Sequence, residues 1–411
     1  MLKHEGVVIH ISDSLLQKMT VLVGSIDSIS NKPVEIFNEY RVEFLSQLSR
    51  RLLTNPACKA LPDVVTFAFW CRQSNLRRMR SFYAQDDRLK VGLGLTFHIC
   101  PANVPINFAF SMAFGLLSGN TCVIRLPSKS SASVDLLIHE VKAQLNDFKL
   151  VDFQQNLVLI RFDRDEDLSR FWMSVADGRV VWGGDDTVMH MRTFPSKPRS
   201  REVAFSDRYS LCALNPESIL QMDELIFKQF SNHLFNDIYL MDQAACSSPQ
   251  LIVWIGEKNA VQQAKSRLWP EVISIANAKY SLEAVHAMDK FVKACRSALT
   301  DVHVQVIERH ENMLYRMALS SVDQHQDELR GHFGSIYEVT LPDLEALAPI
   351  VNERYQTLTI HGIDPSFVRQ WIIRHRLRGI DRVVPIGRAL DMSIVWDGYD
   401  LISSLSRVID V

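Results

Sequence analysis

Short apolar runs alternate with amphipathic segments from residue 93 onward. Five runs rich in branched or aromatic residues predict buried strands: Leu93–Ile99, Thr121–Leu126, Leu157–Arg161, Arg179–Trp182 and Glu202–Ser206. Apolar residues at helical spacing predict four helices between them: Pro105–Ser118, Ser131–Leu145, Glu166–Ala176 and Asp185–Met191. Because alternating strands and helices are typical of a parallel, doubly wound sheet, we expect ligands at the carboxyl ends of these strands.

A second series of strands and helices begins near residue 210. The predicted strands are Leu251–Ile255, Val302–Ile307, Asn312–Leu319, Ile336–Thr340 and Thr357–Ile360. The predicted helices are Glu217–Leu234, Ala260–Leu268, Leu282–Ser297, Glu345–Asn352 and Pro365–His375. The first 90 residues are predicted to be mainly helical, with Ile36–Leu53 as the clearest helix. We therefore predict an α/β fold of two domains, 1–210 and 211–411, with the active site in the cleft between them.

Composition narrows the possible functions only slightly. Apolar residues make up 47% of the 411 residues, and the net charge of -2 gives no general attraction to nucleic acid or to a membrane surface. The sequence shows no signal peptide and no run of 18 apolar residues. Seven cysteines without a CxxC pair, and histidines without HExxH, favour a reduced cytoplasmic protein without disulfides or a metal site.

One cysteine stands among small residues directly before a predicted strand. The segment Asp242-Gln-Ala-Ala-Cys-Ser-Ser-Pro249 precedes Leu251–Ile255, so Cys246 is predicted in a turn with little side-chain bulk over the sulfur. Cys246 is therefore a candidate nucleophile. The alternative is a buried cysteine without chemistry.

Two segments at strand ends are candidates for nucleotide binding. Gly183 and Gly184, between a strand and a helix, would let backbone amides approach a phosphate; an ordinary tight turn is the alternative. Arg125, Ser128 and Lys129 lie at the end of another strand, where a cation and a hydroxyl suit a ribose or its phosphate. Since no carboxylate occupies that turn, the segment favours NADP(H) over NAD(H).

A third strand end places one amide between two prolines. Pro101 and Pro105 restrict the loop around Asn103. A rigid Asn N–H is a good donor to a developing oxyanion, because it does not have to reorganise when the charge appears. The alternative is an Asn that only satisfies loop backbone.

Together these segments resemble the long-chain acyl-CoA reductases, aldehyde-forming enzymes of bacterial bioluminescence and their relatives within the aldehyde dehydrogenase superfamily. The matching segments are Gly94–Pro105, Ser118–Lys129, Val181–Asp185, Asp207–Ser210, Asp242–Pro249, Gly331–Gly334, Asp381–Leu390 and Trp396–Asp400. The resemblance implies two Rossmann-like domains, the first for NADP(H) and the second carrying the nucleophile.

The resemblance also implies roles for single residues. Cys246 corresponds to the acyl-accepting nucleophile and Asn103 to the side-chain oxyanion donor. Arg125 corresponds to a lysine that contacts the adenosine ribose, the Gly183-Gly184 pair to a turn near the pyrophosphate, and Phe333 to an aromatic beside the nicotinamide.

Two departures from the superfamily pattern bear on the chemistry. Aldehyde-oxidising members carry a general-base Glu in a Glu-Leu-Gly-Gly segment, whereas the corresponding Ala204–Ser210 has no Glu and only Asp207 nearby. An acidic residue that usually holds the nicotinamide ribose is replaced by His332. No base for Cys246 is identified; His98 and His332 are candidates by chemistry alone, and a structural role is the alternative for each.

The resulting hypothesis is NADPH-dependent reduction of a fatty acyl-CoA or acyl-protein thioester to the aldehyde, through an acyl-Cys246 intermediate. A homo-oligomer and a partner acyl-protein synthetase are implied by the resemblance. Two rival hypotheses remain. The first is an aldehyde-oxidising dehydrogenase with Asp207 or another carboxylate as base, and the second is a non-redox subunit that only carries the acyl group.

Overall fold

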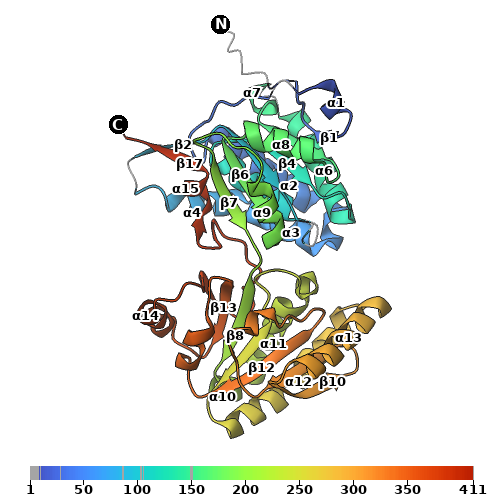
Figure 1. The fold of residues 1–411 in the computed structure, drawn as a ribbon, viewed down its shortest axis with the longest axis vertical. Coiled ribbons are helices and arrows are strands. Elements are labelled where there is room, and N and C mark those ends of the chain that lie inside the picture. The colour runs from blue at the N-terminus through green and yellow to red at the C-terminus, as the bar shows by residue number, and fades with distance from the viewer. Residues whose placement is uncertain are drawn as a thin grey trace. The chain divides into compact units, whose positions relative to one another are not determined.

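The computed structural model describes residues 9, 11–27, 29–85, 88–101, 104, 106–148 and 151–410, with only the backbone for 151 and 152. The chain forms two compact units (Figure 1): Met1–Ser206 with Met392–Val411, and Asp207–Asp391. The first unit thus ends four residues before the predicted boundary at 210. It also includes the last twenty residues, which the prediction placed in the second domain.

The sheet of the first unit has six strands in the order β1-β5-β4-β3-β6-β7. They are β1 (Thr20–Val23), β3 (Leu95–Ile99), β4 (Thr121–Leu126), β5 (Leu157–Arg161), β6 (Gly178–Trp182) and β7 (Arg201–Phe205). All neighbours are parallel except β1, which runs antiparallel to β5 at the edge. The predicted parallel sheet is therefore confirmed.

Helices cover both faces of this sheet, as two consecutive residues of β3 show. Phe97 stacks on Trp172 of α8, with ring centroids 5.9 Å apart, whereas His98 hydrogen-bonds Ser111 of α5. Because consecutive strand residues point to opposite faces, α8 and α5 lie on opposite faces, as in a doubly wound fold. The helices that alternate with the strands are α5 (Asn107–Leu117), α6 (Ala132–Asp147), α7 (Val151–Gln154), α8 (Glu166–Val175) and α9 (Asp185–Arg192).

The N-terminal region is helical but not exclusively so. Its elements are α1 (Asp13–Leu16), α2 (Glu39–Thr54), a 3₁₀ turn (Pro56–Ala60), α3 (Pro62–Trp70), α4 (Gln73–Ser81) and β2 (Leu89–Gly92). The C-terminal return adds β15 (Val395–Trp396), β16 (Tyr399–Asp400), α15 (Leu401–Ser404) and β17 (Ser406–Ile409). Antiparallel pairing of β17 with β2 fixes the end of the chain to the first unit.

The sheet of the second unit has seven strands in the order β10-β11-β12-β9-β8-β13-β14. They are β8 (Tyr209–Leu214), β9 (Leu251–Ile255), β10 (Val304–His310), β11 (Leu314–Leu319), β12 (Ser335–Leu341), β13 (Tyr355–His361) and β14 (Arg382–Pro385). All pairs are parallel except β10 with β11. The helices are α10 (Pro216–Leu220), α11 (Glu224–Tyr239), α12 (Lys258–Lys279), α13 (Ala284–Thr300) and α14 (Pro365–His375).

Three predicted helices of the second unit differ most from the structure. The single helix predicted over Glu217–Leu234 is two helices, because Asp223 caps α11 by accepting from the Ile226 N–H at 2.9 Å. Helix α12 continues through Pro270 to Lys279. The helix predicted over Glu345–Asn352 is a 3₁₀ segment, Glu345–Ile350, that contains Pro349.

Candidate functional site

Cys246 lies in a hydrogen-bonded turn at the amino end of β9. The Ser248 N–H donates to the Ala245 carbonyl at 3.0 Å, and the Cys246 side chain is half-buried while Ser247 and Ser248 are buried. Strands β8, β9, β12 and β13 are parallel, so Cys246 lies at the amino edge of this sheet. The nucleophile candidate therefore lies at the opposite edge from the one expected for ligands of a parallel sheet.

The backbone before Cys246 takes an uncommon conformation. Met241, Asp242 and Gln243 all have left-handed φ angles, of 58°, 57° and 60°. The fully buried Gln243 side chain supports this run: its Nε2 donates to the carbonyls of Pro249 and Ser335, each at 3.0 Å. Its Oε1 accepts from the backbone N–H groups of Gly334 at 3.1 Å and Ser335 at 3.2 Å. Gln243 thus joins the cysteine turn to the loop 331–335.

Phe333, on that loop, is held from three sides. Its N–H donates to the Asp242 carbonyl at 3.1 Å, and its ring stacks on His286 with centroids 4.2 Å apart. Its carbonyl accepts from the buried Lys290 ammonium at 2.7 Å, and burial lowers the pKa of Lys290 to about 7. The structure therefore brings Phe333 close in space to the Cys246 turn, 87 positions earlier in the chain.

Gln356, at the start of β13, contacts the nucleophile candidate directly. Its Nε2 donates to the Cys246 Sγ at 3.3 Å, and the Gln356 side chain is 1% exposed. The next residue, Thr357, donates its N–H to the Ser210 hydroxyl at 3.1 Å, and Ser210 donates to the Cys246 carbonyl at 2.7 Å. Strand β13 thus supports both the sulfur and the backbone of Cys246, and no sequence motif had singled out Gln356.

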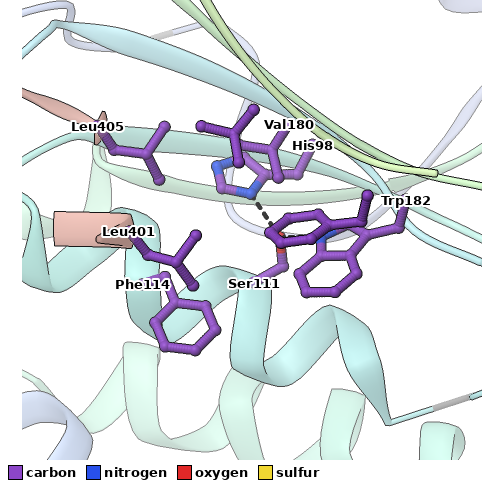
Figure 2. A pocket seen from close by; sticks show the side chains of 9 residues that line it. His98, Ser111, Phe114, Val180, Trp182, Leu401 and Leu405 are labelled. Atoms are coloured by element: carbon purple, nitrogen blue, oxygen red, sulfur yellow. Dashed lines mark hydrogen bonds between the residues drawn. The ribbon is translucent and has the colours of Figure 1, made fainter. Parts of the chain in front are cut away.

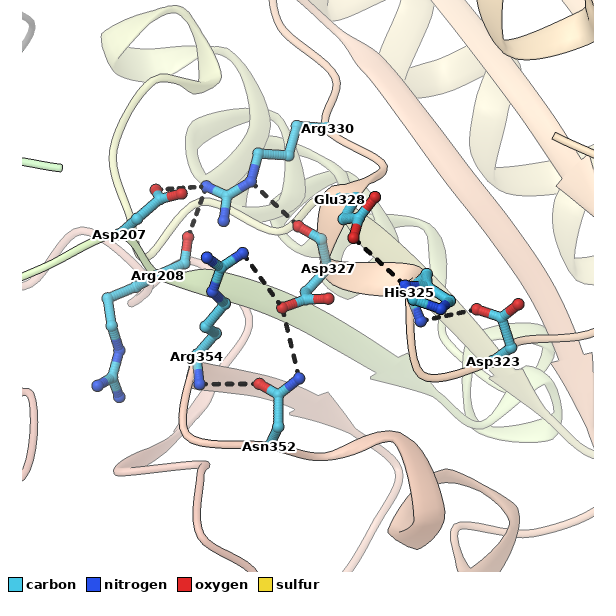
Figure 3. A network of polar contacts seen from close by, with 9 residues as sticks. All are labelled: Asp207, Arg208, Asp323, His325, Asp327, Glu328, Arg330, Asn352 and Arg354. Atoms are coloured by element: carbon cyan, nitrogen blue, oxygen red, sulfur yellow. Dashed lines mark hydrogen bonds and ion pairs between the residues drawn. The ribbon is translucent and has the colours of Figure 1, made fainter. Parts of the chain in front are cut away.

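Asp207 is engaged in an ion-pair network (Figure 3). Its Oδ1 accepts from Arg330 Nη1 at 3.0 Å, and the same Nη1 donates to the Arg208 carbonyl at 2.7 Å. Arg330 also donates from Nε to the Asp327 carbonyl at 3.2 Å. These contacts tie the Asp207 side chain to Arg330 of the loop that leads to Phe333.

His332 lies on the loop 331–335, directly before Phe333 and two residues after Arg330. Burial, with the positive charges of Lys293 and Arg330, lowers the pKa of His332 to about 4, against an opposing influence of Asp242. Its imidazole is therefore neutral at neutral pH, and it carries no charge that would stabilise a thiolate.

The candidate nucleotide-binding residues gather at the carboxyl edge of the first sheet. Strands β4 and β6 both flank β3 in parallel, so Arg125 on β4 and Gly183 after β6 lie at the same edge. Arg125 donates to the Phe162 carbonyl at 3.2 Å and lies over the Phe162 ring, 4.7 Å from its centroid. Ser128 and Lys129 are exposed in the turn that follows β4.

Groups of both charge signs lie near Arg125 at this edge of the sheet. Burial lowers the pKa of Arg125, while Cys100 and Asp163 act in the opposite direction and Arg164 adds to the lowering. A carboxylate, Asp163, therefore lies near Arg125, although it follows β5 and not β4. This weakens the sequence argument for NADP(H) over NAD(H).

Gly183 and Gly184 form the connection from β6 to α9. Gly184 is the N-cap residue of α9 and has open space where a side chain would be, as a phosphate approach requires. The first turn of α9, however, carries Asp185 and Asp186. Two carboxylates at this helix terminus disfavour a second anion there, so the helix itself does not fit a pyrophosphate well.

Asn103 lies outside the described residues. His98, the other base candidate, is fully buried in the first unit (Figure 2), where burial lowers its pKa to about 3. Ser111 Oγ lies 2.7 Å from Nδ1 and Thr96 Oγ1 lies 2.9 Å from Nε2. Since Trp182 donates to Ser111 and Thr96 donates to the Thr121 carbonyl, the direction of the chain puts the His98 proton on Nε2. His98 is a structural residue.

In the described part of the chain, no three His, Cys, Asp or Glu side chains are grouped so that they could hold a metal ion. No helix in the described ranges is long and apolar enough to cross a membrane. All seven cysteines are free thiols, and only Cys246 and Cys295 are not buried.

A family model described as acyl-CoA reductase (LuxC) matches residues 40–408. The chain belongs to this family. The resemblance inferred from the sequence motifs is therefore confirmed, and the family match includes both units.

Similar proteins agree with this family. A long-chain acyl-protein thioester reductase of Aliivibrio fischeri is 21% identical over 323 residues, which are 77% of this chain and 63% of that protein. The chain thus spans less than two thirds of that relative's length. Among solved structures, aldehyde dehydrogenase 21 of Physcomitrella patens has a TM-score of 0.62 at 10% identity, covering 90% of this chain and 85% of that one.

A second solved structure shows the same fold. The glyceraldehyde-3-phosphate dehydrogenase GapN of Methanocaldococcus jannaschii, complexed with NADP, has a TM-score of 0.59 at 13% identity and covers 90% of this chain and 88% of that one. Identities this low show the fold alone. The two solved structures confirm the predicted aldehyde dehydrogenase-like α/β architecture.

Proposed function

We propose that this protein reduces a long-chain fatty acyl thioester, carried on CoA or on a protein, to the fatty aldehyde with NADPH, through an acyl-Cys246 intermediate. Family membership and relatives named long-chain acyl-protein thioester reductase support the reaction class. The observation that carries the proposal is the half-buried Cys246, in a turn of small residues, with the Gln356 amide on its sulfur.

In the first step, the Cys246 sulfur attacks the acyl carbonyl carbon. A new C–S bond forms, the carbonyl oxygen becomes an oxyanion, and collapse expels the original thiolate, which leaves acyl-Cys246. We assign the Asn103 side-chain amide as an oxyanion donor, with a backbone N–H near Cys246 as the second. Each such donor contributes about 3–4 kcal/mol to transition-state stabilisation in comparable sites.

For the second step, NADPH held by the residues proposed below would supply the hydride that the thioester carbon of acyl-Cys246 accepts. The new oxyanion collapses, the C–S bond breaks, and the electron pair returns to the Cys246 sulfur as the aldehyde leaves. Neither step consumes water, and water in the site would hydrolyse the acyl-Cys246 thioester. The ion pair of Asp207 with Arg330 supports a structural role for that carboxylate.

Several residues are proposed as cofactor contacts. The Arg125 guanidinium and the exposed Lys129 and Ser128 fit a phosphate-bearing ribose, since Arg125 Nε is buried and has no hydrogen-bond partner among the described residues. The NADP complex of the archaeal structural neighbour supports a nicotinamide cofactor. Gly183 and Gly184 are proposed near the pyrophosphate through their backbone only, because Asp185 and Asp186 follow. Phe333, fixed by Lys290 and His286, is proposed beside the nicotinamide.

A steady-state assay tests this proposal. Protein incubated with NADPH and acyl-CoA of increasing chain length should consume NADPH only when acyl-CoA is present, most rapidly with long chains, and release aldehyde. A good rate of acid formation from free aldehyde and NADP⁺ would instead show an aldehyde-oxidising enzyme. Acyl labelling without NADPH binding in a fluorescence titration would show a non-redox acyl carrier.

The resemblance also motivates two proposals about assembly. We propose that the protein forms a homo-oligomer in the cytoplasm and receives its acyl group from an acyl-protein synthetase. Light scattering coupled to size-exclusion chromatography tests the first, with a monomer at micromolar concentration as the contrary result. Reduction of free fatty acid by this protein, ATP and NADPH only when a synthetase is added tests the second.

A further inference from the structure

Helix α13 carries an exposed row of apolar residues, here called the α13 stripe. Its five members are apolar or a thiol, and all are exposed: Val285, Met288, Val292, Cys295 and Leu299. The four apolar side chains are between 48% and 86% exposed. Successive members are three or four residues apart, which places them on one face of the helix. Because a surface helix normally turns such a row towards its core, the exposure of this one indicates a contact outside the second unit.

The opposite face of α13 makes the contacts within the second unit, where the helix packs against β10 and β11 (Figure 1). Lys290 is 2% exposed, and its Nζ donates to the Asn312 carbonyl at 2.6 Å. Further along the same face, the Ser297 hydroxyl lies 2.7 Å from the Tyr337 hydroxyl. Since the helix repeats every 3.6 residues, Lys290 and Ser297 lie on the side opposite the α13 stripe. The stripe therefore faces outward.

The α13 stripe is complementary to a second copy of itself. A twofold axis between positions 293 and 294 would pack two copies of the helix antiparallel. Three pairs of exposed apolar or thiol side chains would then meet: Val285 with the partner's Val302, Met288 with the partner's Leu299, and Val292 with the partner's Cys295. Val302 follows the helix in the turn before β10 and is 89% exposed. Each member of the stripe thus faces a side chain that also needs cover from water.

The residues beside the stripe fit the same antiparallel arrangement. Asp289 and Arg296 are exposed on one flank, and the twofold axis would place each beside the other residue of the partner, which gives two ion pairs. On the other flank, Phe291 would lie beside the partner's Ala298, a large side chain against a small one. A parallel arrangement would instead place Arg296 beside the partner's Phe291 and would form neither ion pair. Charge complementarity therefore selects a second copy in the antiparallel orientation.

We propose that two copies of this chain associate through α13, which packs antiparallel against the same helix of the second copy. Such an interface is isologous, so a single stripe supplies both of its halves. The helix has 17 residues and is therefore about 25 Å long, so the interface is small and the dimer should dissociate on dilution. This inference deepens the proposed homo-oligomer and rests on it, since it names the surface through which the copies meet.

Sedimentation of the full chain over a series of concentrations tests the surface. Leu299→Lys would bury a charge against apolar side chains and should raise the dissociation constant of the dimer about tenfold or more. Ile373→Lys is the matched control, because Ile373 is 65% exposed in the last turn of α14 in the same unit. It should leave the dissociation constant within about twofold of the parent value.

A charge exchange tests the orientation. Asp289→Arg alone would face two cations with each other on that flank and should raise the dissociation constant about fivefold to tenfold. Addition of Arg296→Asp restores opposite charges and should return the constant to within about twofold of the parent. Both residues are exposed, so circular dichroism should show the parent fold in each variant. A merely structural role of either residue in α13 would not give this rescue.

Cross-linking tests the register. Two preparations, Met288→Cys and Leu299→Cys, each in a Cys295→Ser background, are mixed and treated with a short bis-maleimide, and the linked peptides are identified by mass spectrometry. The proposal predicts a link between positions 288 and 299 of different copies, formed only in the mixture. Links between two copies of position 288 would show a parallel pair and would overturn the proposal.

Failure of this surface is distinguishable from failure of the proposed function. A dimer that Leu299→Lys leaves intact, or one that the charge exchange does not rescue, would overturn the α13 interface and keep the proposed homo-oligomer. A monomer at every concentration would overturn both. These measurements use neither NADPH nor an acyl thioester, so reductase turnover is confirmed or refuted separately.

Discussion

Substitution of Gln243 by methionine should cost about 3–5 kcal/mol of unfolding free energy, because one side chain satisfies four backbone groups of two loops. Gln243 is fully buried, and methionine fills a similar volume but neither donates nor accepts strongly. The Ser335 N–H also donates to the His332 carbonyl at 3.1 Å, so it keeps a partner. The loss therefore falls on the Gly334 N–H and on the Pro249 and Ser335 carbonyls, at about 1–2 kcal/mol for each buried group.

Urea unfolding followed by tryptophan fluorescence measures this loss, since Trp254, Trp269 and Trp371 are buried in the second unit. Gln263→Met is the matched control. Gln263 is exposed on α12 and its side chain donates to the exposed Asn259 at 3.4 Å, so its substitution should change stability by less than about 0.5 kcal/mol. A loss below about 1 kcal/mol would refute the view that Gln243 holds the two loops together.

Three further predictions concern buried and paired charges. Burial lowers the pKa of His98 to about 3, against about 6.5 in the unfolded chain, so the stabilising contribution of neutral His98 is present above pH 6.5 and falls as the pH drops. In urea titrations, the difference in unfolding free energy between wild type and His98→Phe should therefore narrow by about 1–2 kcal/mol from pH 7 to pH 5. A constant difference would contradict a buried, neutral His98. Asp207→Asn should lower the unfolding free energy by at most about 1 kcal/mol, since this carboxylate is 44% exposed. The variant should form aldehyde at a rate within about threefold of wild type, and loss of this activity would make Asp207 a catalytic group. Glu338→Gln should cost about 1.5–3 kcal/mol in thermal or urea unfolding, because the buried Arg316, 3.0 Å from Glu338, would lose this carboxylate and keep only Glu308. A change below about 1 kcal/mol would show that water replaces the lost carboxylate.

Strands with continuous apolar runs and clear borders were predictable from the sequence. Thr121–Leu126, Leu157–Arg161 and Leu251–Ile255 have the predicted bounds in the structure, as does the helix Pro365–His375, which begins with a proline after a capping Asp364. In each, local side chains are enough to define the element.

Elements stabilised by distant partners were not predictable. Strand β8, Tyr209–Leu214, is fully buried, yet Ser210 interrupts its apolar run and Cys212 and Ala213 are small. Its identity comes from β9 and β13 on either side. Strand β17 pairs with β2, which lies more than 300 positions earlier, so no local pattern could assign the last residues to the first unit.

The residues of the candidate site also fall into those that the local sequence identifies and those that only distant contacts reveal. Cys246 stood out because its neighbours are small, and the structure leaves it half-buried in a turn. Gln356 could not be found, since its contact with the sulfur joins residues 110 positions apart. His98 was a base candidate by residue type, whereas only the structure shows Ser111 and Thr96 on its two nitrogens. Residue type is local, but the partners that decide a role are not.

The central claim is that Cys246 carries the acyl group between the thioester and the hydride. A single-turnover experiment tests it most directly: protein is mixed with a long-chain acyl-CoA without NADPH, digested, and the acylated peptide is identified by mass spectrometry. The account predicts one acylated peptide, containing Cys246, that loses its acyl group as aldehyde within one turnover after NADPH is added. Aldehyde formation by the Cys246→Ala variant, or an acyl-Cys246 that NADPH does not discharge, would contradict it.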